Sequence, residues 1–235
     1  MNPKNRSTSS ISIVRLCVLM VALAIATMCL SLGTVAKYAT SDSTQDSAHV
    51  AKFGVRVSAS DESSFKTEYT SSDNTITVKS SNGDRVVAPG TSDEKGLGFS
   101  IIGSPEVATK VDVSLNVSKD VFLKTKKDGK EYYYYPVKFT LTRNDEVVAE
   151  GNLETIQKAL DNYSKVATYK AYTTLMNSFN LSWTWDYSST DRDTDVWDTQ
   201  LGDIAAGIKP AGFVDGEDYS LDIEYSISVS VYQVD

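Results

Sequence analysis

The segment 219–234 holds the longest apolar alternation in the chain and is the strongest constraint on its fold. Its apolar members are Leu221, Ile223, Tyr225, Ile227, Val229 and Val231, with acidic or serine residues between them. A period of two places these side chains on one face of an extended strand. At about 3.3 Å per residue, such a strand can run the full height of a β-sandwich. We expect it to be central in its sheet.

Shorter runs of the same kind recur through the chain. Expected strands cover residues 50–57, 65–70, 75–79, 97–102, 107–117, 121–123, 132–141 and 179–185. Asn82-Gly83-Asp84 and Pro89-Gly90 are turn signals between them, and Asp128-Gly129 predicts a hairpin. Antiparallel strands at these short intervals predict an all-β, jelly-roll-like β-sandwich over residues 50–235.

One stretch departs from the β pattern. Leu153, Ile156, Leu160 and Tyr163 follow steps of three and four residues, and Asn152 precedes them as a suitable N-cap. We therefore expect one helical excursion, near residues 153–170, that packs on the sandwich or caps one of its ends.

The N-terminus has the pattern of an export signal. Lys4, Arg6 and Arg15 precede an apolar run from Val18 to Ala26, and small residues close the run before Lys37. We predict a signal peptide at 1–36, with cleavage between Ala36 and Lys37. An uncleaved membrane anchor is the alternative, because residues 16–36 are long enough to cross a bilayer.

Removing this leader changes the composition. Cys17 and Cys29 are lost with it, so the mature chain has no thiol and no disulfide. The leader also carries three basic residues and no acid, so the formal net charge falls from −8 to −11. A chain this acidic is a poor partner for nucleic acid or anionic lipid. Membrane contact is expected only through an uncleaved leader, and the remaining length suits one domain.

The mature chain offers no assembled catalytic motif. His49 is the single histidine, and no HExxH motif, Ser-His-Asp triad or cysteine nucleophile is available. A paired-carboxylate mechanism stays open, although nothing marks a particular pair of acids. We therefore expect no enzyme activity and no cofactor.

An acidic stretch near the C-terminal third is the best metal candidate. Asp191, Asp193 and Asp195 have the first spacings of a calcium loop, but Val196 and Gly202 stand where that loop needs Gly and Glu. The EF-hand interpretation fails. Calcium in another loop geometry that also uses Asp198 and a solvated acidic loop both remain open.

Aromatic residues suggest a second kind of site. The run Tyr132 to Tyr135, or Trp183 with Trp185, could stack on sugars. The alternative is structural, because tyrosine favours strands and its hydroxyl can reach water or backbone. The structural interpretation is preferred.

Several segments together resemble a known family. They are LGTVAKY at the leader end, AKFGVRVSAS, VAPGTSDEKGLGFSIIGSPEVATKVDVSLNV with Pro89 and Gly90 at its turn, WTWDYSSTDRDTDVWDTQLGD, and the closing SISVSVYQVD. These resemble the exported TasA/camelysin family of Gram-positive biofilm-matrix proteins, whose signal peptides are cut by the signal peptidase SipW.

The resemblance implies a jelly-roll subunit, secreted to the extracellular matrix or cell surface, that polymerises head to tail with copies of itself. The segment 37–49 would then be mobile until its strand completes the sheet of the next subunit by strand addition. A second exported fibre or anchor protein could join the polymer. The implied donor residues are Lys37, Tyr38, Ala39, Thr40, Ser41, Asp42, Ser43 and Thr44.

Two other functions stay open. A surface carbohydrate-binding jelly roll would use the aromatic residues above. A camelysin-like protease is the third possibility, because camelysin was assigned that activity, but the chain has no matching zinc motif.

Overall fold

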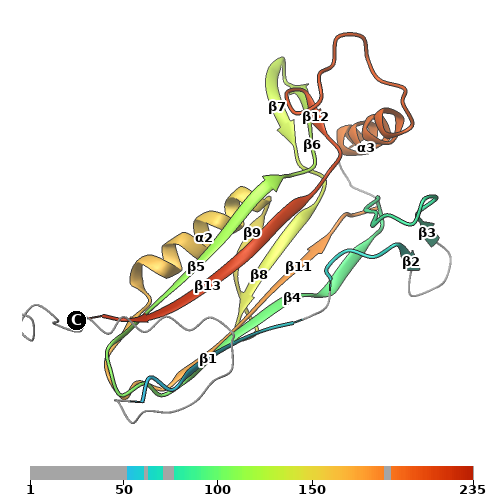
Figure 1. The fold of residues 1–235 in the computed structure, drawn as a ribbon. Coiled ribbons are helices and arrows are strands. Elements are labelled where there is room, and N and C mark those ends of the chain that lie inside the picture. Colours follow the sequence, from blue (N-terminus) through green and yellow to red (C-terminus); the bar gives the residue numbers. More distant parts are fainter. Residues whose placement is uncertain (1–51, 61–62, 71–76, 188–191, 235) are drawn as a thin grey trace, which may run out of the picture. The chain divides into compact units, whose positions relative to one another are not determined.

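The computed structural model describes residues 52–60, 63–70, 77–187 and 192–234 (Figure 1). All of them belong to one compact unit, residues 38–235. This described part is mostly β-structure with two helices. Neither helix is both long and apolar enough to pass through a bilayer.

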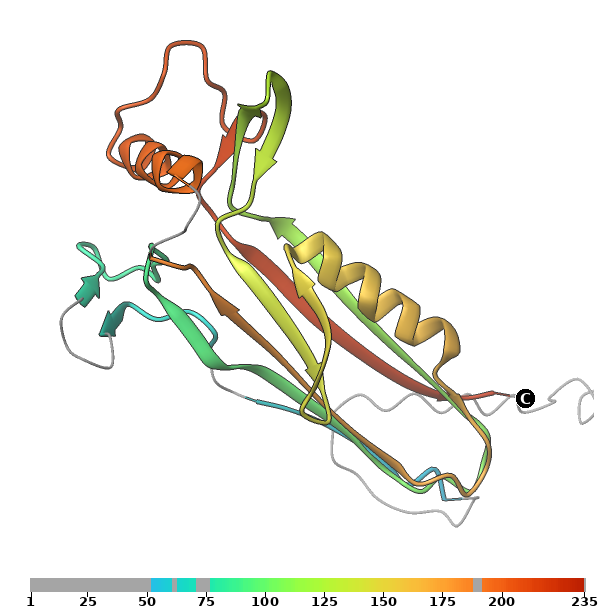
Figure 2. The same cartoon turned by 180° about the vertical axis from the view of Figure 1, so that it is seen from behind.

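Two antiparallel sheets form the body of the fold (Figures 1 and 2). The five-stranded sheet has the spatial order β1 (Val55–Ala59), β4 (Ser92–Gly103), β11 (Leu175–Thr184), β8 (Lys138–Arg143) and β9 (Glu146–Gly151). The three-stranded sheet has the order β10 (Thr168–Tyr169), β5 (Thr109–Lys119) and β13 (Glu224–Gln233).

Two smaller sheets extend from these. One contains β12 (Tyr219–Ser220), β6 (Phe122–Lys127) and β7 (Lys130–Tyr134). The other pairs β2 (Glu68–Thr70) with β3 (Thr77–Lys79). Within the described residues, no sheet closes into a barrel.

Apolar side chains of both large sheets share one core. The fully buried members include Ile101 of β4, Leu181 of β11 and Phe139 of β8, together with Val111 and Leu115 of β5. The alternation predicted for residues 107–117 is confirmed, since Ser114 and Asn116 face solvent. Burial of one face of each sheet therefore holds the two sheets together.

The predicted helix is α2 (Leu153–Val166), which lies against β5 and β9. The Asn152 side chain accepts a hydrogen bond from the Thr155 backbone N–H, so the predicted N-cap is confirmed. Leu153, Ile156 and Leu160 are its buried stripe. The helix ends at Val166 and not near residue 170, because the chain turns at Ala167 and enters β10.

The predicted hairpin at Asp128-Gly129 is confirmed. Both residues have positive φ, 53° and 76°, and Lys127 pairs with Lys130 across the turn. The single strand expected over 132–141 is wrong. Pro136 lies in a break between β7 and β8, because proline cannot donate to a ladder.

Other strand boundaries also move. The first described strand is β1, which starts at Val55 because residues 52–54 are not strand, and the strand expected at 97–102 is the longer β4. Of the run 65–70, only β2 is strand.

The last alternating segment is not one central strand. It contains the short β12 and the ten-residue β13, and β13 lies at the outer edge of its sheet. The alternation reports that one face is buried, and it carries no information on whether both edges are paired.

The acidic stretch is not a loop either. Residues Arg192–Ala205 form α3, which buries Trp197, Leu201 and Ile204. These three follow steps of four and three residues, which is the period of one helix face. Asp193 and Asp195 lie in its first turn, where carboxylates favour the helix dipole. The described residues therefore contain two helices, whereas one was predicted.

Candidate functional site

The outer edges of the two large sheets are the places where this fold could accept another chain. An outer strand presents unpaired backbone N–H and C=O groups, which can pair with another strand. The four outer edges are those of β1 and β9 in one sheet, and of β5 with β10 and of β13 in the other. They differ strongly in how they are protected.

Helix α2 covers the outer edge of β5. The Ser164 hydroxyl accepts a hydrogen bond from the Val113 N–H at 2.7 Å and donates one to the Val113 carbonyl at 2.8 Å. Gln157 Nε2 donates to the Leu115 carbonyl at 2.9 Å, and the Val111 N–H donates to the Ala167 carbonyl at 2.9 Å. Beyond these bonds, β10 pairs with the start of β5. This edge is closed from within the molecule.

The edges of β1 and β9 carry features that discourage pairing. Strand β9 has exposed Glu146 and Glu150, and its register against β8 is interrupted by a bulge near Val148. Strand β1 has five residues and carries the exposed Arg56. Short length, charge and bulges are the usual protections of an edge strand.

The outer edge of β13 has none of these protections. From Tyr225 to Gln233 it has no charged residue, proline or glycine, and its register with β5 shifts only between Glu224 and Tyr225. Among the described residues, β5 is its single strand partner. Long, flat and uncharged edges are the ones that invite another strand.

The inner face of β13 is also incompletely covered. Val229 and Ile227 lie opposite Val113 and Leu115 of β5, which are each 1% exposed. Val229 and Ile227 are half-buried, as is Tyr225. On β13 the same core layer is therefore only partly shielded from solvent, apart from Val231, which is 3% exposed. A further strand beside β13 would bury these side chains.

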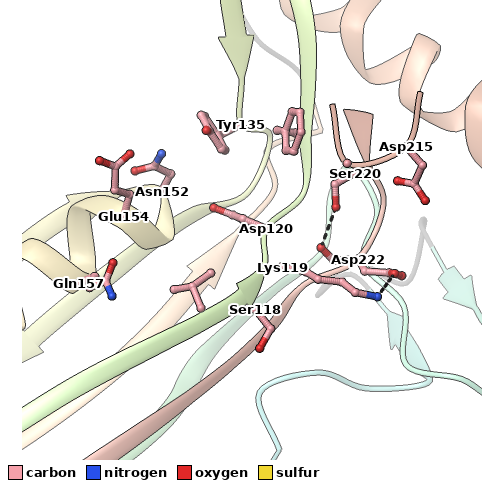
Figure 3. A pocket seen from close by; sticks show the side chains of 13 residues that line it. Ser118, Lys119, Asp120, Tyr135, Asn152, Glu154, Gln157, Asp215, Ser220 and Asp222 are labelled. Carbon is pink, nitrogen blue, oxygen red and sulfur yellow. Dashed lines mark hydrogen bonds and ion pairs between the residues drawn. The ribbon is translucent and has the colours of Figure 1, made fainter. Parts of the chain in front are cut away.

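A hollow of about 450 Å³ lies near the start of β13 (Figure 3). Its lining includes Asp120, Glu154, Asp215 and Asp222, and Lys119 pairs with Asp222 at 2.7 Å. Figure 3 shows these side chains coming from the end of β5, the start of α2, the segment before β12 and the segment between β12 and β13.

Asp120 has a structural role in this hollow. Burial raises the pKa of its carboxyl to about 6, although hydrogen bonds from the backbone N–H groups of Leu153 and Val121 act in the opposite direction. Its Oδ2 lies 3.3 Å from the Leu153 nitrogen. The carboxylate therefore anchors the start of α2 to the end of β5.

The candidate calcium residues do not converge. Asp193 and Asp195 lie in the first turn of α3, and Asp191 is outside the described residues. Asp198 accepts hydrogen bonds from the Tyr134 hydroxyl at 2.7 Å and from Trp185 Nε1 at 3.1 Å. Burial raises the pKa of Asp198. In the described ranges, no three His, Cys, Asp or Glu side chains are placed to hold a metal ion.

The tyrosines of the run 132–135 pack on neighbouring aromatic rings, while Tyr132 and Tyr133 remain 40% and 46% exposed. Tyr132 and Tyr134 pack on Trp197 at centroid distances of 5.4 and 5.2 Å. Tyr133 and Tyr135 pack near Phe122 at 5.8 and 6.2 Å.

The tryptophans are not available as a stacking surface. Trp183 is 2% exposed and Trp185 is 6% exposed. The alternative that these two tryptophans stack on a sugar is therefore contradicted, because both rings lie in the core.

Some predicted site residues fall outside the described residues. They are the cleavage residues Ala36 and Lys37, the donor residues 37–44, and His49. The edge position of β13 was missed, because the sequence pattern predicts a central strand. The signal that points to it is the absence of any charge over Tyr225–Gln233.

The comparisons with known proteins give no relative. No family model, no curated protein and no solved structure matches this chain.

Proposed function

We propose that this protein is an exported structural subunit of extracellular biofilm-matrix fibres. Its two large sheets form a jelly-roll-like sandwich, and the outer edge of β13 accepts the segment 37–47 of a neighbouring copy. A signal peptidase frees that segment during export. The observation that carries this proposal is the long, uncharged edge of β13. The other three outer edges of the two large sheets are covered or protected.

The lengths of the two partners agree. Strand β13 has ten residues, and residues 37–47 offer a run of similar length without proline or glycine. A strand added here forms backbone hydrogen bonds worth about 1 kcal/mol each. Association costs about 4 to 15 kcal/mol, so side chains must supply the surplus.

The open inner face of β13 can supply part of that surplus. Tyr225, Ile227 and Val229 lose their remaining exposed surface when a neighbour strand covers them, at about 25 cal/mol per Å² of apolar area. Tyr38 is the one large side chain that the donor contributes between Lys37 and Ser47. The acceptor therefore provides more of the apolar contact than the donor.

Deleting residues 37–47 tests the proposal. The truncated protein should unfold with the melting temperature of the unassembled wild-type monomer and stay monomeric, because the deletion removes no residue of the described domain. Negative-stain microscopy should show filaments of the full mature chain and none of the deletion. Filaments of the deletion would refute strand donation.

A pair of matched variants tests the acceptor. Val229→Lys puts a charge at the open inner face of β13 and should abolish filaments. Val147→Lys puts the same charge on β9, where the valine is already 62% exposed, and should leave filaments intact. Equal filament formation by both variants would place the contact elsewhere.

A further inference from the structure

We infer that the edge of β13 takes its partner strand in the antiparallel direction, from a second copy stacked head to tail, and that the molecule's own leading segment cannot pair in this way. This inference rests on the proposed function, and it specifies the geometry of the contact between copies.

The first described residues lie at the end of the domain where β13 finishes. The Lys52 N–H donates to Glu106 Oε2 at 3.1 Å, and the Glu106 N–H donates to the Lys52 carbonyl at 3.0 Å. Gln233 pairs with Thr109, a few residues after Glu106 in sequence. The chain that precedes Lys52 therefore starts its path at the finishing end of β13.

From that end, the molecule's own segment can follow β13 only in the parallel direction. Residues 47–51 would link Lys52 to the segment, residue 46 would lie near Gln233 and residue 37 near Glu224, so the segment would run from N- to C-terminus in the same sense as β13. Antiparallel pairing within the molecule would first require the chain to travel the length of β13 unpaired and then return along it.

The chain is too short for that return. The ten residues of β13 span about 33 Å, so the outward and return paths need about 66 Å. Residues 37–51, counted from the predicted cleavage, reach about 50 Å at full extension. Full antiparallel pairing is therefore closed to the molecule's own segment.

A second copy meets the requirement naturally. When its Lys52 end faces the start of β13, its leading segment enters beside Glu224 and runs toward Gln233 with its N-terminus last. This direction is antiparallel, like every strand pair among the described residues of the two large sheets. Antiparallel pairing is also slightly more stable per residue than parallel pairing.

Exposed apolar side chains occur at both ends that such stacking brings together. Near the finishing end, Ile102 and Met176 are paired neighbours on β4 and β11, 53% and 71% exposed. Near the starting end, Val214 and Leu221 flank the entry to β12 and β13 and are also exposed. Because the two contacting ends differ, the contact is heterologous and repeats into a filament.

Cysteine cross-linking tests the direction cleanly, because the mature chain has no cysteine of its own. In the antiparallel arrangement position 45 lies near Ser226, whereas in the parallel arrangement position 39 lies there. We compare Gln45→Cys with Ser226→Cys, and Ala39→Cys with Ser226→Cys. In each case two singly substituted mature proteins are mixed, assembled and oxidised, so that every mixed disulfide joins two copies.

The mixture with Gln45→Cys should give mixed dimers on a non-reducing gel, and the mixture with Ala39→Cys should give few or none. The double variant Ala39→Cys/Ser226→Cys tests parallel pairing within one molecule, and it should form no internal disulfide if the segment is donated to a second copy. A second set uses Ser230→Cys, four residues further along β13. Its partner is Ser41→Cys for antiparallel pairing and Ser43→Cys for parallel pairing, so both sets should report the same direction and the same register.

The outcomes separate this inference from the proposed function. Filaments whose cross-links form through positions 39 and 43 would overturn the antiparallel direction and leave the fibre function standing. An internal disulfide between positions 39 and 226 would show that the segment pairs with β13 of its own molecule in the parallel direction, and would overturn its donation to a second copy. Filaments with no cross-link from any pair would place the contact away from this edge. No filaments from the wild-type mature chain would overturn both proposals.

Discussion

The three-stranded sheet has two outer edges that the same chain treats in opposite ways. At β5, Ser164 and Gln157 of α2 bond to backbone groups that would otherwise be unpaired. At β13, no described residue plays that part for the outer edge. A buried backbone group without a partner costs free energy, so an edge is either covered or left in contact with water. Because α2 covers the β5 edge, the β13 edge is the one in this sheet whose backbone groups can still pair with another strand.

The inner faces differ in the same way. Val113 is 1% exposed under the cover of α2, whereas its neighbour Val229 on β13 is half-buried. The two valines lie directly opposite each other in the ladder. The difference between them therefore reflects what lies beyond each strand, which is α2 beyond β5 and no described strand beyond β13.

The largest expected effect comes from loosening the helix at the covered edge. Leu160 of α2 is fully buried, and Leu160→Ala should lower the free energy of unfolding by about 2 to 5 kcal/mol. Urea denaturation measures this change. Lys158→Ala, on the exposed side of the same helix, should change stability by about 0.5 kcal/mol or less. Equal effects would show that α2 is not held by its apolar stripe.

A smaller effect should follow from removing one edge-capping side chain. Ser164→Ala leaves the N–H and the carbonyl of Val113 without their helix partner, and we expect a loss of about 1 to 3 kcal/mol. Asp161→Ala is the control, because Asp161 is exposed on the same helix. Hydrogen exchange of the Val113 amide should accelerate in Ser164→Ala alone. An unchanged exchange rate would mean that the serine does not protect this edge.

The smallest expected effect is a dependence of stability on pH. Burial raises the folded-state pKa of Asp120 to about 6, above its ordinary value of 3.8, so the folded state holds this proton more tightly than the unfolded chain. The stabilisation from this group is complete below pH 3.8 and is lost as the pH rises through 6.

Between pH 7.5 and pH 5, Asp120 should therefore add about 1 kcal/mol of stability. Asp120→Asn should remove that increment, and comparing the urea midpoints of both proteins at the two pH values isolates it from other carboxylates. Parallel pH profiles for wild type and Asp120→Asn would contradict the raised pKa.

The local sequence pattern predicted the type of several elements, but it did not predict which elements lie beside each other. The period of Leu153, Ile156 and Leu160 indicated α2, and Asp128-Gly129 indicated its hairpin, because both signals depend on residues near each other in sequence. The position of β13 at an edge depends on which strand lies beside it. Alternation alone carries no such information.

The acidic stretch shows how composition can hide an element. Five aspartates between Asp186 and Asp198 suggested a calcium loop, and they obscured the spacing of Trp197, Leu201 and Ile204 that makes α3. The carboxylates at its start are compatible with a helix, because they face the positive end of the helix dipole. The fold therefore uses this stretch for packing.

Amide hydrogen exchange, measured by mass spectrometry on the monomeric deletion of residues 37–47 and on wild-type filaments, tests the open edge most directly. Peptides from β5 should be protected in both samples, because α2 and β13 pair with that strand. Peptides from β13 should exchange faster in the monomer and become protected in the filament. Equal protection of β13 in the two samples would contradict strand addition at this edge.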